Sequence, residues 1–148
     1  MKVEIIIKEM TPELIEDVSD IETNSFSHPW SRKSFEDELN NDNAVYFVAT
    51  ESNRGVGYVG GWIIADQYDV NNIAVLPQYR RCGIASKLLD NLIGYCRKKE
   101  LTAITLEVRE HNNAAKALYN SFGFKPIGFR KKYYSDTGED AIIMSLEI

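Results

Sequence analysis

Apolar side chains repeat every three or four positions between about Ile84 and Lys99. The residues at this spacing are Ile84, Leu88, Leu89, Leu92, Ile93 and Cys96. Such a repeat places them along one face of a helix, so the segment predicts a long amphipathic helix over 84–99. The segment from Ala103 to Val108 alternates between apolar and polar residues instead, which predicts a strand with one buried face.

The rest of the chain predicts further helices and strands. Thr11, followed by proline, and Ser31 are capping residues that predict helices running to about residues 22 and 39. A helix over 113–122 is closed by Gly123. The predicted strands are Val3–Lys8, Val45–Thr50, Val56–Ala65, Tyr68–Val75, Phe124–Phe129 and Ala141–Glu147. This order predicts an α/β (α+β) fold, a mixed sheet flanked by helices.

The composition indicates an ordinary globular protein. The chain has 148 residues, 44% of them hydrophobic, so we expect a single domain over 1–148. Its net charge of −5 disfavours a general nucleic-acid binder. No apolar run approaches the roughly 20 residues of a membrane span, and the N-terminal segment does not resemble an export signal. The two cysteines have no metal-type spacing, so we expect a cytoplasmic protein with reduced thiols and leave its oligomeric state open.

The segment from Asn72 to Ser86 carries the first indication of a ligand site. A strand ending in Ile73-Ala74-Val75 leads into a loop with Arg80 and Arg81, and Gly83 directly precedes the long helix. The first turn of a helix presents unpaired N–H groups and a partial positive charge, which together bind phosphate groups. An ordinary capped helix with two solvated arginines is the alternative interpretation.

A second glycine-rich segment, Gly55-Val56-Gly57-Tyr58-Val59-Gly60, matches the G-x-G-x-x-G pattern of dinucleotide-binding folds. In those folds a helix follows, because its N-terminus holds the pyrophosphate. Here the following residues, Gly61-Trp62-Ile63-Ile64, predict a strand. We therefore interpret the glycines as positions of close backbone contact or bulges in a hairpin.

Two side chains with acid–base chemistry lie further along the chain. Glu107 is near the C-terminal end of its predicted strand, where open sheets place ligands, and Tyr119 is in the helix that follows. A carboxylate and a phenol held close together supply a base and an acid. The alternative interpretations are that Glu107 is an ordinary polar residue on an alternating strand and that Tyr119 only packs against the core.

Together these segments resemble the GCN5-related N-acetyltransferase (GNAT) superfamily. Its loop signature, Gln or Arg followed by Gly and then by Gly or Ala, is met by Arg80, Gly83 and Ala85 between a strand and a long helix. The resemblance implies a mixed, mostly antiparallel sheet of about seven strands flanked by about four helices. It also implies acetyl-coenzyme A (acetyl-CoA) as cosubstrate and no metal.

From about residue 25 onward the chain more closely resembles one bacterial family, the ribosomal-protein-alanine N-acetyltransferases. The matching motifs are Pro29-Trp30-Ser31, Asn72–Val75, Leu106–Arg109, Ala117-Leu118-Tyr119, Tyr133-Tyr134 and Glu139–Met144. This resemblance implies that the partner is a protein N-terminus, that of a ribosomal protein. The acidic surplus agrees with a basic partner.

The resemblance implies roles for individual residues. The general base falls on Glu107 and the general acid on Tyr119. The backbone that grips the acetyl and pantetheine portion falls on Ile73, Ala74 and Val75. The remaining coenzyme contacts fall on the pyrophosphate loop and one asparagine, namely Arg80, Arg81, Cys82, Gly83, Ile84, Ala85, Ser86 and Asn112. The acceptor is expected at aromatic side chains with polar edges, which suit an extended peptide: Trp30, Tyr133 and Tyr134.

Several alternatives stay open. Asp69, on the preceding strand, is a second candidate for the base, because other members of the superfamily carry a carboxylate there. Cys82 as a nucleophile is disfavoured, since the loop uses its backbone N–H groups. His28 stands where relatives carry an apolar or aromatic residue, which bears on the acceptor. The alternative functions are acetylation of a lysine, polyamine or antibiotic amine, and coenzyme binding without catalysis.

Overall fold

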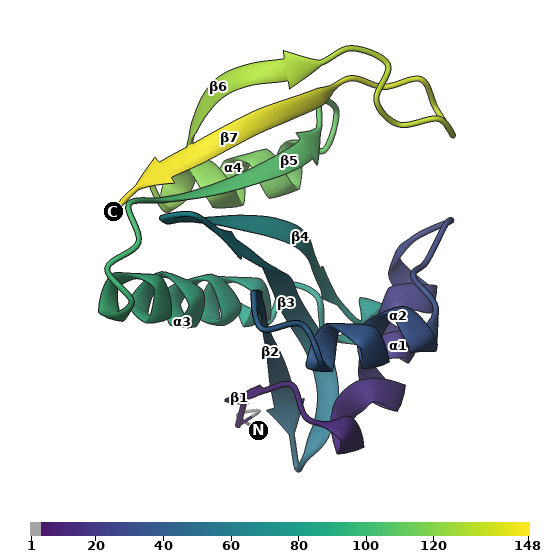
Figure 1. Cartoon of the computed structure of the whole chain (residues 1–148). Coiled ribbons are helices and arrows are strands. Elements are labelled where there is room, and N and C mark those ends of the chain that lie inside the picture. The colour runs from purple at the N-terminus through teal and green to yellow at the C-terminus, as the bar shows by residue number, and fades with distance from the viewer. Residues whose placement is uncertain (1–3) are drawn as a thin grey trace.

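One mixed sheet organises residues 4–148, the range that the structure, a computed structural model, describes. Within this range seven strands lie in the order β1-β2-β3-β4-β5-β7-β6 (Figure 1). Neighbouring strands are antiparallel except β4 and β5, which are parallel. The strands are β1 (Ile6–Glu9), β2 (Ala44–Glu51), β3 (Arg54–Ile64), β4 (Gln67–Val75), β5 (Ala103–Arg109), β6 (Lys125–Arg130) and β7 (Ala141–Glu147).

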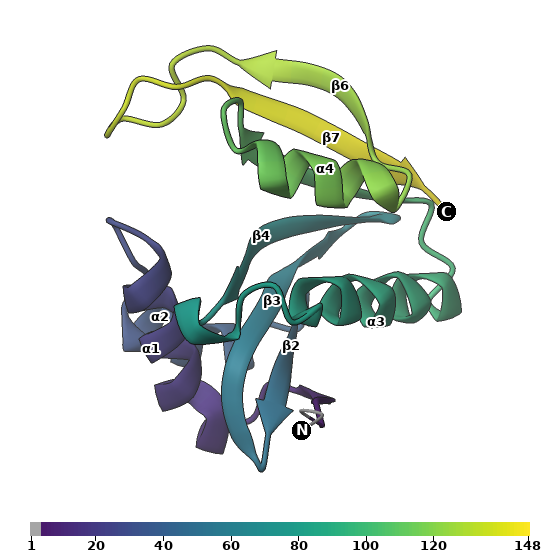
Figure 2. The same ribbon diagram turned by 180° about the vertical axis from the view of Figure 1, so that it is seen from behind.

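Four α-helices of the described range flank the sheet. α1 (Ile15–Ser25) and α2 (Arg32–Leu39) lie on one side, and α3 (Ile84–Lys98) packs across β2, β3 and β4 on the other. α4 (Asn113–Ser121) lies on the same side as α3, in front of β5 and β7 when the molecule is seen from behind (Figure 2). Short 3₁₀ helices, η1 (Pro12–Leu14) and η2 (Pro77–Tyr79), precede α1 and α3. Among these helices none has the length and apolarity that a membrane crossing requires.

The apolar stripe of α3 lies at the centre of the hydrophobic core. All six of its predicted apolar residues are buried and belong to one cluster with buried residues of β2 to β5. Each fully buried leucine there stabilises the fold by roughly 1.5–3 kcal/mol. The predicted helix is therefore confirmed, although it ends at Lys98 rather than Lys99.

The parallel contact between β4 and β5 is short, and this shapes the site. The two strands pair at three positions, from Gln67 with Ala103 to Asp69 with Thr105. Beyond Asp69 the remainder of β4 pairs with β3 alone, while the remainder of β5 pairs with β7 alone. The sheet therefore opens between the C-terminal halves of two neighbouring strands. The backbone groups that face this opening take no part in strand pairing there, so they are in position to bind a ligand.

The glycine-rich segment is confirmed as part of a strand, β3. A Cβ atom on Gly60 would lie 2.0 Å from the ring of Tyr46, and one on Gly61 would lie 2.0 Å from the backbone oxygen of Asp69. The register between β3 and β4 also shifts between these two glycines. They therefore allow close contacts at a bulge, as expected, and form no phosphate loop.

The predicted start of the first helix needs a correction. Thr11 makes no side-chain capping bond, and Pro12 opens the 3₁₀ turn η1 rather than α1. α1 begins at Ile15 and continues to Ser25, beyond the predicted end near residue 22. Ser31 does cap α2, because its hydroxyl accepts the Ser34 N–H at 3.2 Å. The predicted strand from Val3 begins outside the described residues and is seen as Ile6–Glu9.

Candidate active site

The opening between β4 and β5 exposes part of the β4 backbone. The N–H of Leu76 donates to the oxygen of Val56 on β3 at 2.9 Å. Because adjacent strand residues direct their backbone groups to opposite sides, Val75 and Ile73 direct theirs into the opening. Arg80 Nε donates to the Val75 oxygen at 3.4 Å from that side. By the same alternation, Ala74 directs its backbone groups toward β3.

A cavity of about 590 Å³ occupies this opening. Its walls come from β4, β5, α4 and the loop between β6 and β7 (residues 131–140, the β6–β7 loop). Seven residues singled out from the sequence line it together: Asp69, Ile73, Glu107, Asn112, Tyr119, Tyr133 and Tyr134. The fold thus brings the expected base and acid, which are twelve positions apart in the chain, into one cavity.

Glu107 reaches the cavity from the face of the sheet that carries α1 and α2. It alternates with buried Leu106 and Val108, so its side chain points away from the core below α4. Arg130 Nε donates to Glu107 Oε1 at 2.9 Å, and the Glu107 side chain is 29% exposed. A partly solvated carboxylate held by one arginine is available to a group that enters the cavity.

Tyr119 reaches the same cavity from the opposite face of the sheet. It lies on α4 and is buried, with its ring centroid 5.8 Å from that of Phe124. Burial, with a smaller contribution from Tyr134, raises the pKa of its phenol to about 12. None of the hydrogen bonds found among residues 4–148 involves its hydroxyl. The phenol is therefore protonated at neutral pH and free to donate.

The N-terminus of α3 has the conformation expected of an anion-binding turn. Arg81 and Gly83 adopt left-handed φ values of 64° and 76°. The first helical hydrogen bond within α3 runs from the Lys87 N–H to the Gly83 oxygen, so the N–H groups of residues 84–86 precede it. Arg80, Arg81 and Cys82 are exposed around this turn. Residues 74–86 line neither this cavity nor the second one described below, and lie instead at the end of β4.

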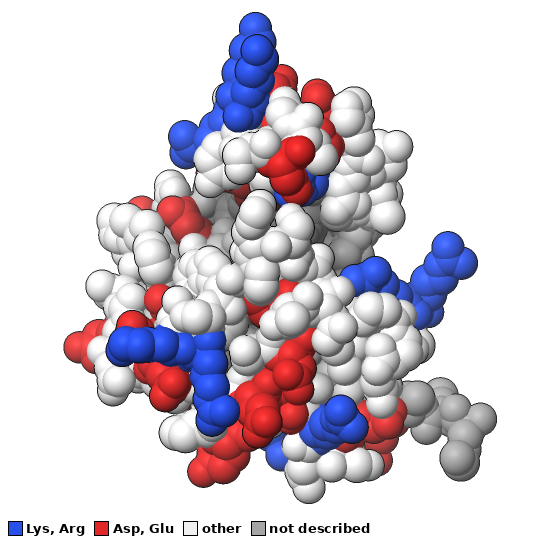
Figure 3. Space-filling model, turned by 90° about the vertical axis from the view of Figure 1, so that its right-hand side faces the viewer, with Lys and Arg blue, Asp and Glu red and all other residues white. Residues whose placement is uncertain are grey.

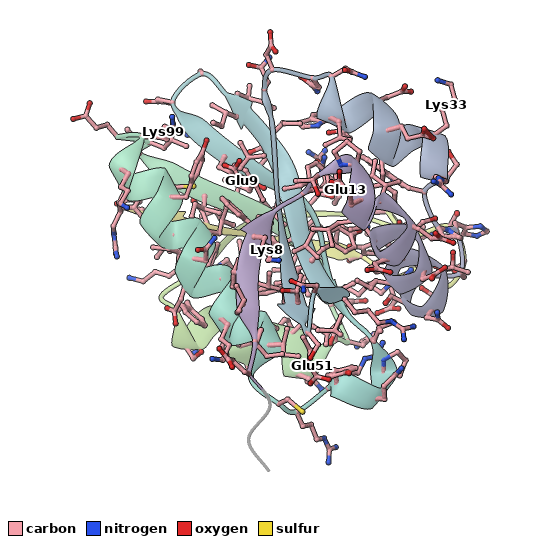
Figure 4. The ribbon with its side chains drawn as sticks, turned by 90° about the horizontal axis from the view of Figure 1, so that it is seen from below. Lys8, Glu9, Glu13, Lys33, Glu51 and Lys99 are labelled. Atoms are coloured by element: carbon pink, nitrogen blue, oxygen red, sulfur yellow. The ribbon has the colours of Figure 1, made fainter. Side chains whose placement is uncertain are left out.

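A side-chain contact fixes the loop that leads to this turn. The Tyr79 hydroxyl donates to Glu51 Oε1 at 2.9 Å, which ties η2 to the end of β2. Figure 4 labels Glu51 near this loop. The hydrogen bond to the carboxylate raises the pKa of the Tyr79 phenol. The turn before α3 is therefore anchored on both sides, by β4 and by β2.

A second cavity, of about 690 Å³, adjoins the first. It lies between the β6–β7 loop and the loop from α1 to α2 (residues 26–31, the α1–α2 loop), and Trp30 and His28 line it. The two cavities share part of their lining: Phe26, Asn72, Arg109, Asn112, Tyr133 and Tyr134. Figure 3 shows the side of the molecule where these two loops meet. All three expected acceptor residues therefore lie around connected space.

Asn112 has a second role besides lining both cavities. Its side-chain oxygen accepts the Ala115 N–H at 3.2 Å and caps α4. That bond occupies the oxygen and leaves the amide NH₂ as the group that can contact a ligand. Asn112 thus joins the start of the helix that carries Tyr119 to the boundary between the two cavities.

Glu22, a fully buried carboxylate of α1, was not among the residues predicted for the site. It is 1% exposed and accepts hydrogen bonds from the Tyr58 hydroxyl, the Trp30 N–H at 2.9 Å and the Asn72 amide at 3.3 Å. It lines the second cavity and holds one end of the α1–α2 loop. One signal could have found it: Glu22 stands four residues after Val18, on the apolar stripe of its helix.

The remaining candidates occupy distinct places. Asp69 lines the first cavity and accepts a hydrogen bond from the Thr105 hydroxyl, so it stays an alternative base. Cys82 is exposed, with its sulfur 3.7 Å from the Arg80 oxygen. His28 is exposed at the second cavity, and His111 Nε2 lies 3.3 Å from Glu110. No group of three or more His, Cys, Asp or Glu residues in the described part of the chain could hold a metal ion.

Comparisons with known proteins show which family the chain is similar to. The family described as Acetyltransferase (GNAT) matches residues 15–124. A Bacillus subtilis protein, provisionally named a ribosomal protein bS18-alanine N-acetyltransferase, is 40% identical over all of this chain and 99% of that protein. The ribosomal protein bS18-alanine N-acetyltransferase of Escherichia coli K12 is 37% identical over 86% of this chain and 87% of its own length.

A solved structure shows the same architecture. The crystal structure of the ribosomal-protein-S18-alanine N-acetyltransferase from Escherichia coli matches 98% of this chain and 94% of its own, with a TM-score of 0.91 and 33% identity. The fold expected from the sequence, a mostly antiparallel seven-stranded sheet with four helices, is therefore confirmed over the described residues.

Proposed function

The chain belongs to the GNAT acetyltransferase family, and from this premise we propose that it moves an acetyl group from acetyl-CoA to the N-terminal amine of a ribosomal protein. One observation carries the mechanism: Glu107 and Tyr119 enter a single cavity from opposite faces of the sheet. A base and an acid on opposite sides of the reacting centre suit direct transfer between two bound molecules.

The residues present fit acetyl-CoA, which supplies an acetyl group already activated as a thioester. The N–H groups at the start of α3, with Arg80 and Arg81 beside them, form a basic turn suited to a diphosphate. Ile73 and Val75 present backbone groups along the opening, which suit the amide groups of the pantetheine arm. The N–H of Val75 would polarise the thioester carbonyl.

Glu107 is the proposed general base. A protein α-amine has a pKa of about 7.7–8.0, so much of it is protonated at neutral pH and must lose a proton before it attacks. The carboxylate of Glu107 would accept that proton, directly or through a water molecule. Arg130 holds Oε1 in place at 2.9 Å and thereby orients the carboxylate.

Tyr119 is the proposed general acid. A departing thiolate has a conjugate-acid pKa near 8.5, by analogy with cysteine, so proton donation assists its departure. Since burial raises the pKa of Tyr119 to about 12, the phenol carries its proton throughout the neutral range. Its position on α4, beside the coenzyme side of the opening, supports this role.

The relatives' names and the charge of the chain support a ribosomal acceptor. Both the Bacillus subtilis and the Escherichia coli relatives are named for ribosomal protein bS18. Several acidic side chains gather on the face seen in Figure 3. The helices α1 and α2 are rich in them and include Glu16, Asp17, Asp20, Glu36 and Asp37. This charge would steer a basic protein toward the site, since opposite charges accelerate encounter.

The test is an acetyl-transfer assay with purified protein and acetyl-CoA. The substrates are a peptide with the N-terminal sequence of ribosomal protein bS18, the same peptide with its α-amine blocked but a lysine added, and a polyamine. We expect transfer to the free α-amine alone, and a fall in kcat of at least about 100-fold for Glu107→Gln. Preferential transfer to the lysine side chain or to the polyamine would contradict the proposal that the acceptor is a protein N-terminal amine. Coenzyme binding without transfer to any amine would indicate a non-catalytic module.

A further inference from the structure

Arg109 holds the β6–β7 loop from the strand that carries Glu107. Its guanidinium donates to both carboxylate oxygens of Asp136, each at 2.9 Å. It also donates to Glu139 at 3.4 Å and lies 4.0 Å from the ring centroid of Tyr134. Such a two-point arginine–carboxylate pair fixes orientation as well as distance.

Asp136 extends this contact to the other wall of the second cavity. Its Oδ2, which accepts from Arg109, also lies 3.3 Å from the Ser27 hydroxyl, which donates to it. Ser27 belongs to the α1–α2 loop, whose other end is held by the bond from the Trp30 N–H to Glu22. The series Arg109–Asp136–Ser27 therefore connects β5 to both loops around the acceptor cavity.

The charges in this series agree with a lasting ion pair. The hydrogen bond to Asp136 raises the pKa of Arg109, and the reciprocal bond from Arg109 lowers the pKa of Asp136. Arg109 stands two positions after Glu107, so both side chains lie on the same face of β5. Arg109 lines both cavities, but its guanidinium N–H groups donate to residues of the β6–β7 loop.

We propose that Arg109 is a positioning residue for the acceptor. Through Asp136 and Ser27 it holds Tyr133 and Tyr134 opposite Trp30, so that the acceptor N-terminus meets walls already set at the correct separation. This rests on the proposed function, since it assigns the second cavity to the acceptor. Preorganised walls reduce the entropy lost on binding, so the effect falls on acceptor affinity and not on the coenzyme.

Steady-state kinetics of variants test the proposal. Arg109→Met removes the charge and the paired bonds, Arg109→Lys keeps the charge, and Asp136→Asn alters the partner. Lys33→Met is the matched control, because it breaks an exposed ion pair with Asp37 on α2, and neither residue lines either cavity. Figure 4 labels Lys33. We expect Arg109→Met to raise the KM of the peptide about ten-fold, with kcat and the KM of acetyl-CoA within about two-fold of wild type. We expect the peptide KM of Arg109→Lys to lie between those of wild type and Arg109→Met.

The double variant Arg109→Met with Asp136→Asn separates this role from general loss of stability. If the two residues act as one unit, its peptide KM equals that of Arg109→Met within about two-fold. A peptide KM unchanged in Arg109→Met, equal rises in both KM values, or fully multiplicative effects in the double variant would overturn the proposal. None of these results would affect the proposed function, which depends on transfer by the wild type and its loss in Glu107→Gln.

Discussion

Arg130 at the end of β6 pairs with Glu107 in the middle of the site, Nε to Oε1 at 2.9 Å. The arginine side chain is 56% exposed, so the ion pair is open to solvent and contributes little to the stability of the fold. Its main effect is to orient the Glu107 carboxylate. Arg130 also lies 5.8 Å from the ring centroid of Tyr133. The proposed base and an acceptor-lining aromatic residue therefore share one cation.

Replacing Arg130 is expected to slow the reaction while the protein stays folded. Arg130→Met leaves the Glu107 carboxylate without its fixed partner, so we expect kcat to fall about ten-fold. Arg130→Lys retains a cation and should lose less. Lys131→Met, at the next position, which is also exposed, is the control and should match wild type. A wild-type kcat for Arg130→Met would show that Glu107 needs no such partner.

Tyr119→Phe removes the proposed acid with little structural cost. No hydrogen bond found within residues 4–148 involves its hydroxyl, so the free energy of unfolding should change by less than about 1 kcal/mol. We expect kcat to fall about 100-fold or more, because general acid catalysis is typically worth at least that factor. Single-turnover measurements with saturating acetyl-CoA report the chemical step directly. Should the variant retain full single-turnover rate, another group protonates the thiolate.

Two glycines, one directly before α3 and one inside it, form a matched pair for testing the coenzyme turn. Gly83 has a φ of 76°, and Gly94 lies inside α3, and a Cβ atom at either would meet nothing within 4 Å. Gly83→Ala forces alanine into a left-handed conformation, so we expect a loss of about 1 kcal/mol and a higher KM for acetyl-CoA. Gly94→Ala should stabilise the helix by about 0.5–1 kcal/mol with no effect on KM. Urea denaturation measures the free energy of unfolding, and rates at varied acetyl-CoA concentration give its KM. If Gly83→Ala and Gly94→Ala had the same KM for acetyl-CoA, the turn before α3 would not be the coenzyme site.

The ion pair of Arg109 and Asp136 predicts a particular pH dependence. Because Arg109 lowers the pKa of Asp136 below its usual value of 3.8, the folded state binds the proton less tightly than the unfolded state. The stabilisation is therefore complete above that usual value and is lost as the pH falls through the lower folded value. We expect the Tm advantage of wild type over Asp136→Asn to shrink as the pH drops from about 5 to about 3. A constant difference would mean that the pair contributes nothing to folding.

The helices and strands of this chain follow largely from local patterns. The stripe of α3 and the alternation of β5 depend on residues within one element, which is why their bounds could be predicted to within a residue or so. Thr11 shows the limit, since a capping residue was expected to start α1 and the chain instead makes a 3₁₀ turn there. The side chain of a threonine cannot by itself decide which helical form follows.

The site was less accessible to sequence reasoning than the fold. Glu107 and Tyr119 were candidates from their chemistry and position, and the family resemblance supplied their roles, but their meeting in one cavity depends on the short pairing of β4 with β5. Arg109 and Asp136 are 27 positions apart in the chain, and Ser27 and Asp136 are 109 apart, so no local pattern joins them. Glu22 could not be predicted for another reason. Its hydrogen-bond partners Tyr58 and Asn72 lie on two strands that pack against α1 only in the folded protein.

The three-residue contact between β4 and β5 has a kinetic consequence. In the proposed arrangement the coenzyme lies along β4 and the acceptor enters from the second cavity, so occupancy by one reactant does not block the route of the other. Both can be present at once, and the chain needs no acylated form of its own to carry the group between them. Double-reciprocal plots of the initial rate, at several fixed concentrations of either reactant, should therefore give intersecting lines. Parallel lines would indicate a mechanism through an acylated enzyme and would contradict this expectation.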